Sequence, residues 1–106
     1  MPSATITLVG TKPTPAQKRA LFERTTDLMV EVLRRPRNLI VVSLAHGEFE
    51  DWSVAGALLR EGERMGAQVV FRILEGQNSK REIADMVAAM TAMVGEVWAK
   101  MPCRPM

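Results

Sequence analysis

The sequence has one cysteine and one histidine among its 106 residues. The lone cysteine, Cys103, cannot form a disulfide within the chain, so a cytoplasmic protein is expected. A dedicated zinc site is not expected either, because zinc sites use three or four histidine, cysteine or carboxylate ligands. No apolar run approaches the about 18 residues that span a membrane, and no signal peptide is visible. Neither a membrane partner nor a metal is therefore predicted.

The sequence also lacks a strong excess of either positive or negative charge. The chain has 14 basic and 12 acidic residues, a net charge of +2, and the charges are scattered. No arginine-rich stripe with interleaved aromatic residues is present, so nucleic acid is not an expected partner. The densest basic group is Arg34, Arg35 and Arg37. At the end of a predicted helix this group favours an interaction with the helix dipole, with a binding role as the alternative.

Hydrophobic residues make up 47% of the chain, which is enough for the core of one small domain. Ala4, Ile6 and Leu8 alternate with other residues, and this pattern predicts a strand almost at the start of the chain. An amphipathic helix is predicted over residues 15–34, where apolar residues recur every three or four positions. Its start carries a capping-box pattern, and Pro36 ends it.

A continuous apolar run over residues 39–45 predicts a second strand that is covered on both faces and parallel to the first. Residues 46–66 are expected to form a turn, a short extended or helical piece and a linker. A third strand is predicted over residues 68–76. A second long helix then follows a cap at Asn78 or Ser79, and its wide apolar stripe indicates burial over more than one face. Its methionines favour core packing over a pliable binding surface.

The two halves of the chain resemble one another. Each has a strand, a glycine, a polar cap, a Lys-Arg pair and an apolar helix in that order, with Gly10 matching Gly76. The expected fold is α+β, with duplicated β-α units whose two helices pack on one face of a small mixed sheet. One domain over residues 1–106 is predicted, with a first β-α-β unit at 2–64 and a second β-α unit at 67–100.

Five stretches together are similar to the tautomerase superfamily, which includes 4-oxalocrotonate tautomerase and macrophage migration inhibitory factor. They are Pro2, the strand "SATITLVG", the segment "KPTPAQKRALFERTTDLMVEVL", the turn "RPRN" into "LIVVSL", and "DWSVAG". The similarity returns in "ILEGQNSKREI". The length and the duplication resemble the long members, which assemble as trimers, more than the short members, which form hexamers.

The resemblance implies a tautomerase or isomerase that needs no cofactor and acts on a small carboxylate-bearing 2-oxo acid. Pro2, freed by removal of Met1, would be the catalytic base, and cationic side chains would hold the substrate. The candidates for substrate binding are Lys12, Arg37, Arg72 and Trp52. The family's second-strand arginine has no clear counterpart here, so the substrate of 4-oxalocrotonate tautomerase is not assumed. Hydration, decarboxylation and dehalogenation by the same proline stay open.

Each candidate also has a purely structural interpretation. Pro2 can be a strand-edge residue, Lys12 a solvated loop lysine and Trp52 a cap on the core. Arg72 either points into a cavity between subunits or lies on the open face of the sheet, and His46 is expected to be a turn residue. The alternative function is a non-catalytic, oligomeric βαβ-type module that binds a ligand or partner. In both cases unprotected strand edges predict a homo-oligomer. The resemblance to the long members implies that it is a homotrimer rather than a hexamer.

Overall fold

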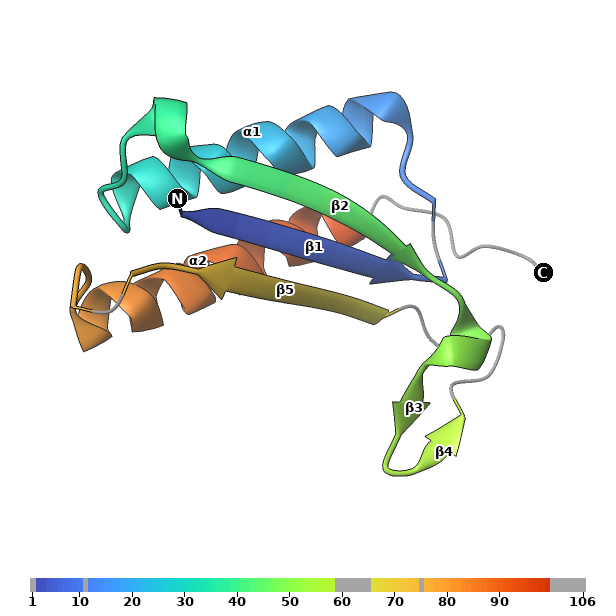
Figure 1. Ribbon diagram of the computed structural model, residues 1–106. Coiled ribbons are helices and arrows are strands. Elements are labelled where there is room, and N and C mark those ends of the chain that lie inside the picture. The colour runs from blue at the N-terminus through green and yellow to red at the C-terminus, as the bar shows by residue number, and fades with distance from the viewer. Residues whose placement is uncertain (1, 11, 59–65, 75, 100–106) are drawn as a thin grey trace.

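Strand β1 (Ser3–Val9) is the middle strand of a three-stranded sheet in the computed structural model (Figure 1). Strand β2 (Val41–Gly47) runs parallel to it on one side, and β5 (Gly66–Arg72) runs antiparallel on the other. The structure describes residues 2–10, 12–58, 66–74 and 76–99 of the chain. The expected mixed sheet and the parallel pairing of the first two strands are confirmed.

The strand register defines two ends of this sheet. At one end, Ser3 lies opposite both Val41 of β2 and Arg72 of β5. At the other end, Val9 lies opposite the terminal glycines of the same two strands. We call these the Ser3 end and the Val9 end. The start of β1, the start of β2 and the finish of β5 therefore meet at the Ser3 end.

Helix α1 (Pro15–Glu31) begins with the predicted capping box. The Thr14 hydroxyl accepts a hydrogen bond from the Gln17 backbone N–H at 3.2 Å, and the Gln17 side chain accepts one from the Thr14 N–H at 2.8 Å. These bonds satisfy amide groups that a helix start leaves without partners. The helix ends three residues before the predicted boundary, and Arg34 in the following turn has a positive φ of 55°.

Helix α2 (Lys80–Trp98) is capped by Ser79, one of the two candidates from the sequence. The other candidate, Asn78, donates from its side-chain amide to the Leu33 carbonyl at 2.8 Å. Because Leu33 lies two residues after the last residue of α1, this hydrogen bond ties the start of α2 to the end of α1.

Both helices cover the same face of the sheet, as expected (Figure 1). Their contact with the strands forms the core, whose buried residues are Ala4, Ile6, Leu8, Leu21, Met29, Leu33, Met86, Met90, Met93 and Val97. The α2 methionines among them confirm core packing over a pliable surface. Between the helices, the fully buried Thr25 hydroxyl lies 3.9 Å from the Met90 sulfur.

Two expectations about burial are wrong. Strand β2 is not covered on both faces: Val41 is 47% exposed, because both helices lie on the other face of the sheet. Helix α2 is not buried over more than one face, since Ile83 and Val87 are 41% and 55% exposed. The sheet and α1 together cover only one stripe of this helix. An apolar run alone does not tell which of its sides another layer will cover.

Beyond β2, the chain forms a short 3-10 helix η2 (Phe49–Asp51) and a small hairpin of β3 (Ser53–Val54) and β4 (Ala57–Leu58). The hairpin extends away from the main sheet beyond the Val9 end (Figure 1). Strand β5 begins two residues before the predicted third strand and ends at Arg72. The expectations for Met1, Cys103 and the linker over residues 59–65 lie outside the described residues.

Candidate active site at the start of strand β1

Pro2 directly precedes β1 and is held beside the neighbouring strand. Its carbonyl accepts a hydrogen bond from the Val41 backbone N–H at 3.2 Å. Proline has no amide hydrogen to donate to a ladder, so a position just before a strand suits it. The residue is partly buried. Pro2 is therefore fixed at the Ser3 end, between the start of β2 and the finish of β5.

Arg72 is the last residue of β5 and lies at the same end. Its partner on β1 is Ser3, and paired residues on neighbouring strands share a face of the sheet. Ser3 alternates with the buried Ala4, so Arg72 lies on the face that the helices leave open. Its side chain is exposed, and in the described part of the chain it forms no ion pair. A guanidinium group is thus available beside the start of β1.

Arg37 also belongs to the Ser3 end. It begins the short 3-10 helix η1 (Arg37–Leu39), which leads into β2. Its Nη1 lies 2.7 Å from an Asp27 carboxylate oxygen on α1, and both side chains are about half exposed. The structure therefore places Pro2, Arg37 and Arg72 at one end of the sheet.

Lys12 and Trp52 lie at the opposite end. Lys12 follows β1, and the seven residues of that strand separate it from Pro2 by about 20 Å. Trp52 packs on the Val9 end, where a Cβ at Gly47 would meet the indole nitrogen. Within one chain, neither residue joins the group around Pro2.

The sequence interpretation missed one contact at the Ser3 end. The Arg35 guanidinium donates to the Gln77 side-chain oxygen at 2.6 Å and to the Leu33 carbonyl at 3.1 Å. Arg35 was interpreted through the helix dipole, with a binding role as the alternative, and Gln77 was not singled out. Their contact joins residues 42 positions apart, so no local pattern announces it. The Arg35 guanidinium and the Gln77 side-chain amide therefore also lie in the loops at the Ser3 end.

His46 lies near the Val9 end, with its Nε2 3.0 Å from a Glu48 carboxylate oxygen. It is therefore not part of the group around Pro2. Across the described ranges, no three histidine, cysteine or acidic residues are grouped so that they could hold a metal ion. No helix in the same ranges is long and apolar enough to cross a membrane.

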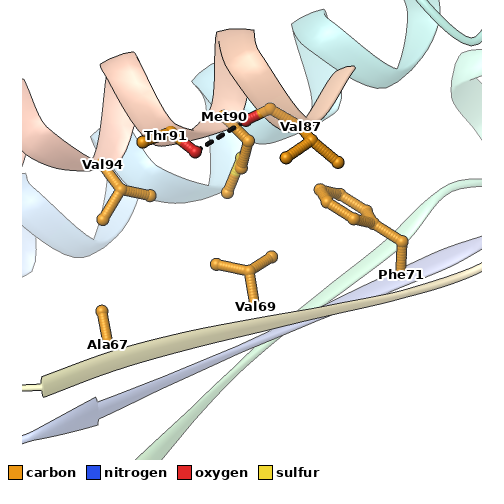
Figure 2. Close-up of a pocket in the computed structure, with 7 residues that line it drawn as sticks. All are labelled: Ala67, Val69, Phe71, Val87, Met90, Thr91 and Val94. Carbon is orange, nitrogen blue, oxygen red and sulfur yellow. Dashed lines mark hydrogen bonds between the residues drawn. The ribbon is translucent and has the colours of Figure 1, made fainter. Parts of the chain in front are cut away.

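An apolar cavity of about 320 Å³ lies between β5 and α2. Figure 2 shows Val69 and Phe71 of β5 on one side of it and Val87 and Val94 of α2 on the other. The one hydroxyl drawn there, on Thr91, donates to the Val87 carbonyl at 2.7 Å (Figure 2). Since the lining residues that the structure describes are all uncharged, they offer no cation to hold a carboxylate.

Comparison with known proteins adds both a family and a fold. The sequence model of the family described as "Tautomerase enzyme" matches residues 2–62, more than half of the chain. No curated protein matches the chain by sequence. A native fused 4-OT superposes with a TM-score of 0.78 at 19% identity, covering 98% of this chain and 83% of that one. Pt0534 inactivated by 2-oxo-3-pentynoate gives 0.76 at 21% identity, covering 90% and 72%.

A fused 4-OT described as a symmetric trimer gives a TM-score of 0.75 at 20% identity, covering 90% of this chain and 74% of that one. At such identities the superpositions establish the shared fold alone. The family model rests on the sequence itself and includes Pro2, all of β1, α1 and β2, and the β3–β4 hairpin. The chain therefore belongs to the tautomerase family.

Proposed function

We propose that this protein is a cofactor-independent tautomerase of small 2-oxo acids, with Pro2 as the general base. Family membership supports the reaction class. The observation that carries the proposal is the position of Pro2, held by Val41 at the start of the central strand with Arg72 at the same end. A base and a carboxylate-binding cation are the two groups that the reaction requires.

Removal of Met1 would change the Pro2 nitrogen from a non-basic amide into a secondary amine. Cations nearby disfavour the ammonium form of such an amine, which keeps more of it neutral near pH 7. The neutral amine takes the proton of the enol hydroxyl. The resulting ammonium then returns a proton to the other carbon of the enol double bond, and the carbon that carried the hydroxyl becomes the keto group. The amine is regenerated in this cycle, and no other reactant is consumed.

Arg72 is the first candidate to bind the substrate carboxylate, since it is exposed and forms no ion pair within the described ranges. A guanidinium group can hold a carboxylate through two parallel hydrogen bonds. Arg37 is the second candidate. Its exposed pair with Asp27 is worth at most about 1 kcal/mol, so exchanging Asp27 for a substrate costs little. Lys12 and Trp52 would join this site only from a neighbouring chain.

We further propose that the protein assembles as a homotrimer, as the related fused 4-OT structure is described. Within the described residues, β2 and β5 each pair along one edge only, and unpaired edges invite another chain. Large apolar side chains are exposed beside these edges and on the projecting hairpin: Val41, Val54, Leu58 and Val70. Light scattering should give three times the chain mass. A monomer at micromolar concentration would contradict this assembly.

The relative inactivated by 2-oxo-3-pentynoate suggests a direct test of the base. The Pro2 amine should add to the triple bond of this compound, forming an N–C bond while its proton moves to the adjacent carbon. Mass spectrometry of a digest should then find one whole reagent added to the peptide that begins at Pro2. A chain that keeps one extra residue before Pro2 has no amine there and serves as the control.

An ultraviolet assay of enol-to-keto conversion, run over a panel of aryl and alkyl 2-oxo acids, tests the activity itself. Turnover above the uncatalysed rate is expected for at least one acid. If the chain forms no adduct and ketonises the whole panel at the uncatalysed rate, the non-catalytic binding module takes the place of this proposal. Hydration, decarboxylation and dehalogenation need substrates of their own, such as an unsaturated acid, a β-keto acid and a halogenated unsaturated acid, with the product identified by mass spectrometry.

A further inference from the structure

We propose that a second site, at the Val9 end of the sheet, binds a small monocarboxylate with a flat apolar body, such as an aryl carboxylate. A cavity of about 390 Å³ lies there between the first turns of α1 and strands β1 and β2. Its volume falls within the range of about 300–1,000 Å³ that is typical of small-molecule sites. Nothing in the proposed chemistry of Pro2 is needed for this inference.

The inner part of this cavity is apolar. Leu8 of β1 is only 1% exposed and contributes to the lining from the sheet. The partly buried Leu44 of β2 lies beside it on the same face, packed against the core. Phe22 of α1 lines the cavity as well, although it is 36% exposed. A phenyl or branched alkyl group inserted here would remove these apolar surfaces from water.

Two lysines supply the positive charge. Lys12 comes from the loop after β1, and Lys18 comes from the first turns of α1. Neither forms an ion pair with any part of the chain that the structure describes. Lys18 and Phe22 are four positions apart, so one face of the helix presents a cation next to an aromatic ring. This pairing fits a ligand with a carboxylate on an apolar body.

Other charged groups around the cavity do not cancel the lysines. The start of α1 adds a partial positive charge to this end of the cavity. Because the Thr14 side chain already accepts a hydrogen bond from an amide of this first turn, the lysine side chains and not the helix amides would bind the anion. His46 also lines the cavity, and its ring nitrogen lies 3.0 Å from Glu48. The Glu48 carboxylate is thus already held by a neighbour. The site favours an anion over a neutral or cationic ligand.

Chemical-shift titration of the ¹⁵N-labelled protein with phenylacetate tests the inference. We expect saturable shifts of the Leu8, Phe22 and Leu44 amides, with a dissociation constant on the order of 1 mM for so small a ligand. Benzyl alcohol keeps the ring without the charge, and acetate keeps the charge without the ring. Each should bind about fivefold more weakly or worse. Equal binding of acetate, or no saturable shift with phenylacetate, would overturn the proposal.

Variants locate the binding. Lys18→Glu should weaken phenylacetate binding about tenfold. Arg19→Glu is the control, because it makes the same charge change on the adjacent residue, which does not line the cavity. In this control the dissociation constant should stay within about twofold of the unaltered protein's. Phe22→Ala should also weaken it. Binding should persist in Arg72→Ala, which alters only the Ser3 end. Equal weakening by the two glutamate variants would show general charge attraction, and loss in Arg72→Ala would assign the binding to Pro2's site. Either result contradicts a second site.

Discussion

Gly10→Ala should destabilise the protein more than Gly76→Ala, although the two glycines occupy matching places in the two β-α units. Their φ values are nearly equal, 78° and 81°, so both substitutions place alanine in the left-handed region at a cost of about 1–2 kcal/mol. At Gly10, a Cβ would also overlap the ring of the buried Phe49. At Gly76, no described atom lies within contact distance of a Cβ.

Forcing Phe49 to move adds an overpacking cost of about 1–3 kcal/mol, so Gly10→Ala should cost about 2–5 kcal/mol in total. Urea denaturation at one fixed protomer concentration gives both free energies of unfolding, since assembly would otherwise shift them. Repeating Gly10→Ala in a Phe49→Ala background should remove the added cost, because the ring is gone. Equal destabilisation by the two glycine substitutions, or full additivity with Phe49→Ala, would refute the reasoning.

Three further outcomes are expected. Thr25→Val should leave the free energy of unfolding unchanged or raise it by up to about 1 kcal/mol, because among the described residues the buried hydroxyl has only the weak Met90 sulfur as acceptor. A clear loss of stability in urea denaturation would contradict this. A hydrogen bond from the Ser79 backbone N–H lowers the pKa of the Glu82 carboxyl below its usual 4.5. The charged carboxylate therefore stabilises the folded chain above pH 4.5, and this stabilisation is lost as the pH falls through the lower pKa of the folded state. Glu82→Gln should therefore show a shallower loss of stability below about pH 4.5 in acid unfolding, and identical acid limbs would count against the assignment. Arg72→Ala should lower kcat/KM for ketonisation about tenfold or more with Arg72→Lys in between, whereas an unchanged kcat/KM would remove Arg72 from the site.

The features of the fold that depend on near neighbours were predictable from the sequence. The caps at Thr14 and Ser79 follow from residues three positions apart, and the alternation in β1 follows from its own side chains. Burial was less predictable, because it depends on layers supplied from elsewhere. Val41 belongs to an apolar run that resembles a strand covered on both faces, yet its outer side is bare in the single chain.

The candidate site was predictable to the same degree. Pro2, Arg37 and Arg72 became candidates through the family resemblance, and only the pairing of β1 with β2 and β5 in the structure places all three at one end of the sheet. Lys12 was a candidate on the same ground, but the length of β1 separates it from Pro2 within one chain. The contact of Arg35 with Gln77 depends on how two distant loops meet, which no pattern within a single element encodes.

The claim that the Pro2 amine is the base is tested most directly by the N-terminus itself. Two preparations are compared, one beginning at Pro2 and one with a single glycine added before it, each verified by intact mass. The measurement is kcat/KM for ketonisation of the best 2-oxo acid in the panel. We expect the glycine-extended chain to lose about 10²-fold or more, because its Pro2 nitrogen is an amide and cannot accept a proton. Equal kcat/KM in two equally folded preparations would contradict the account.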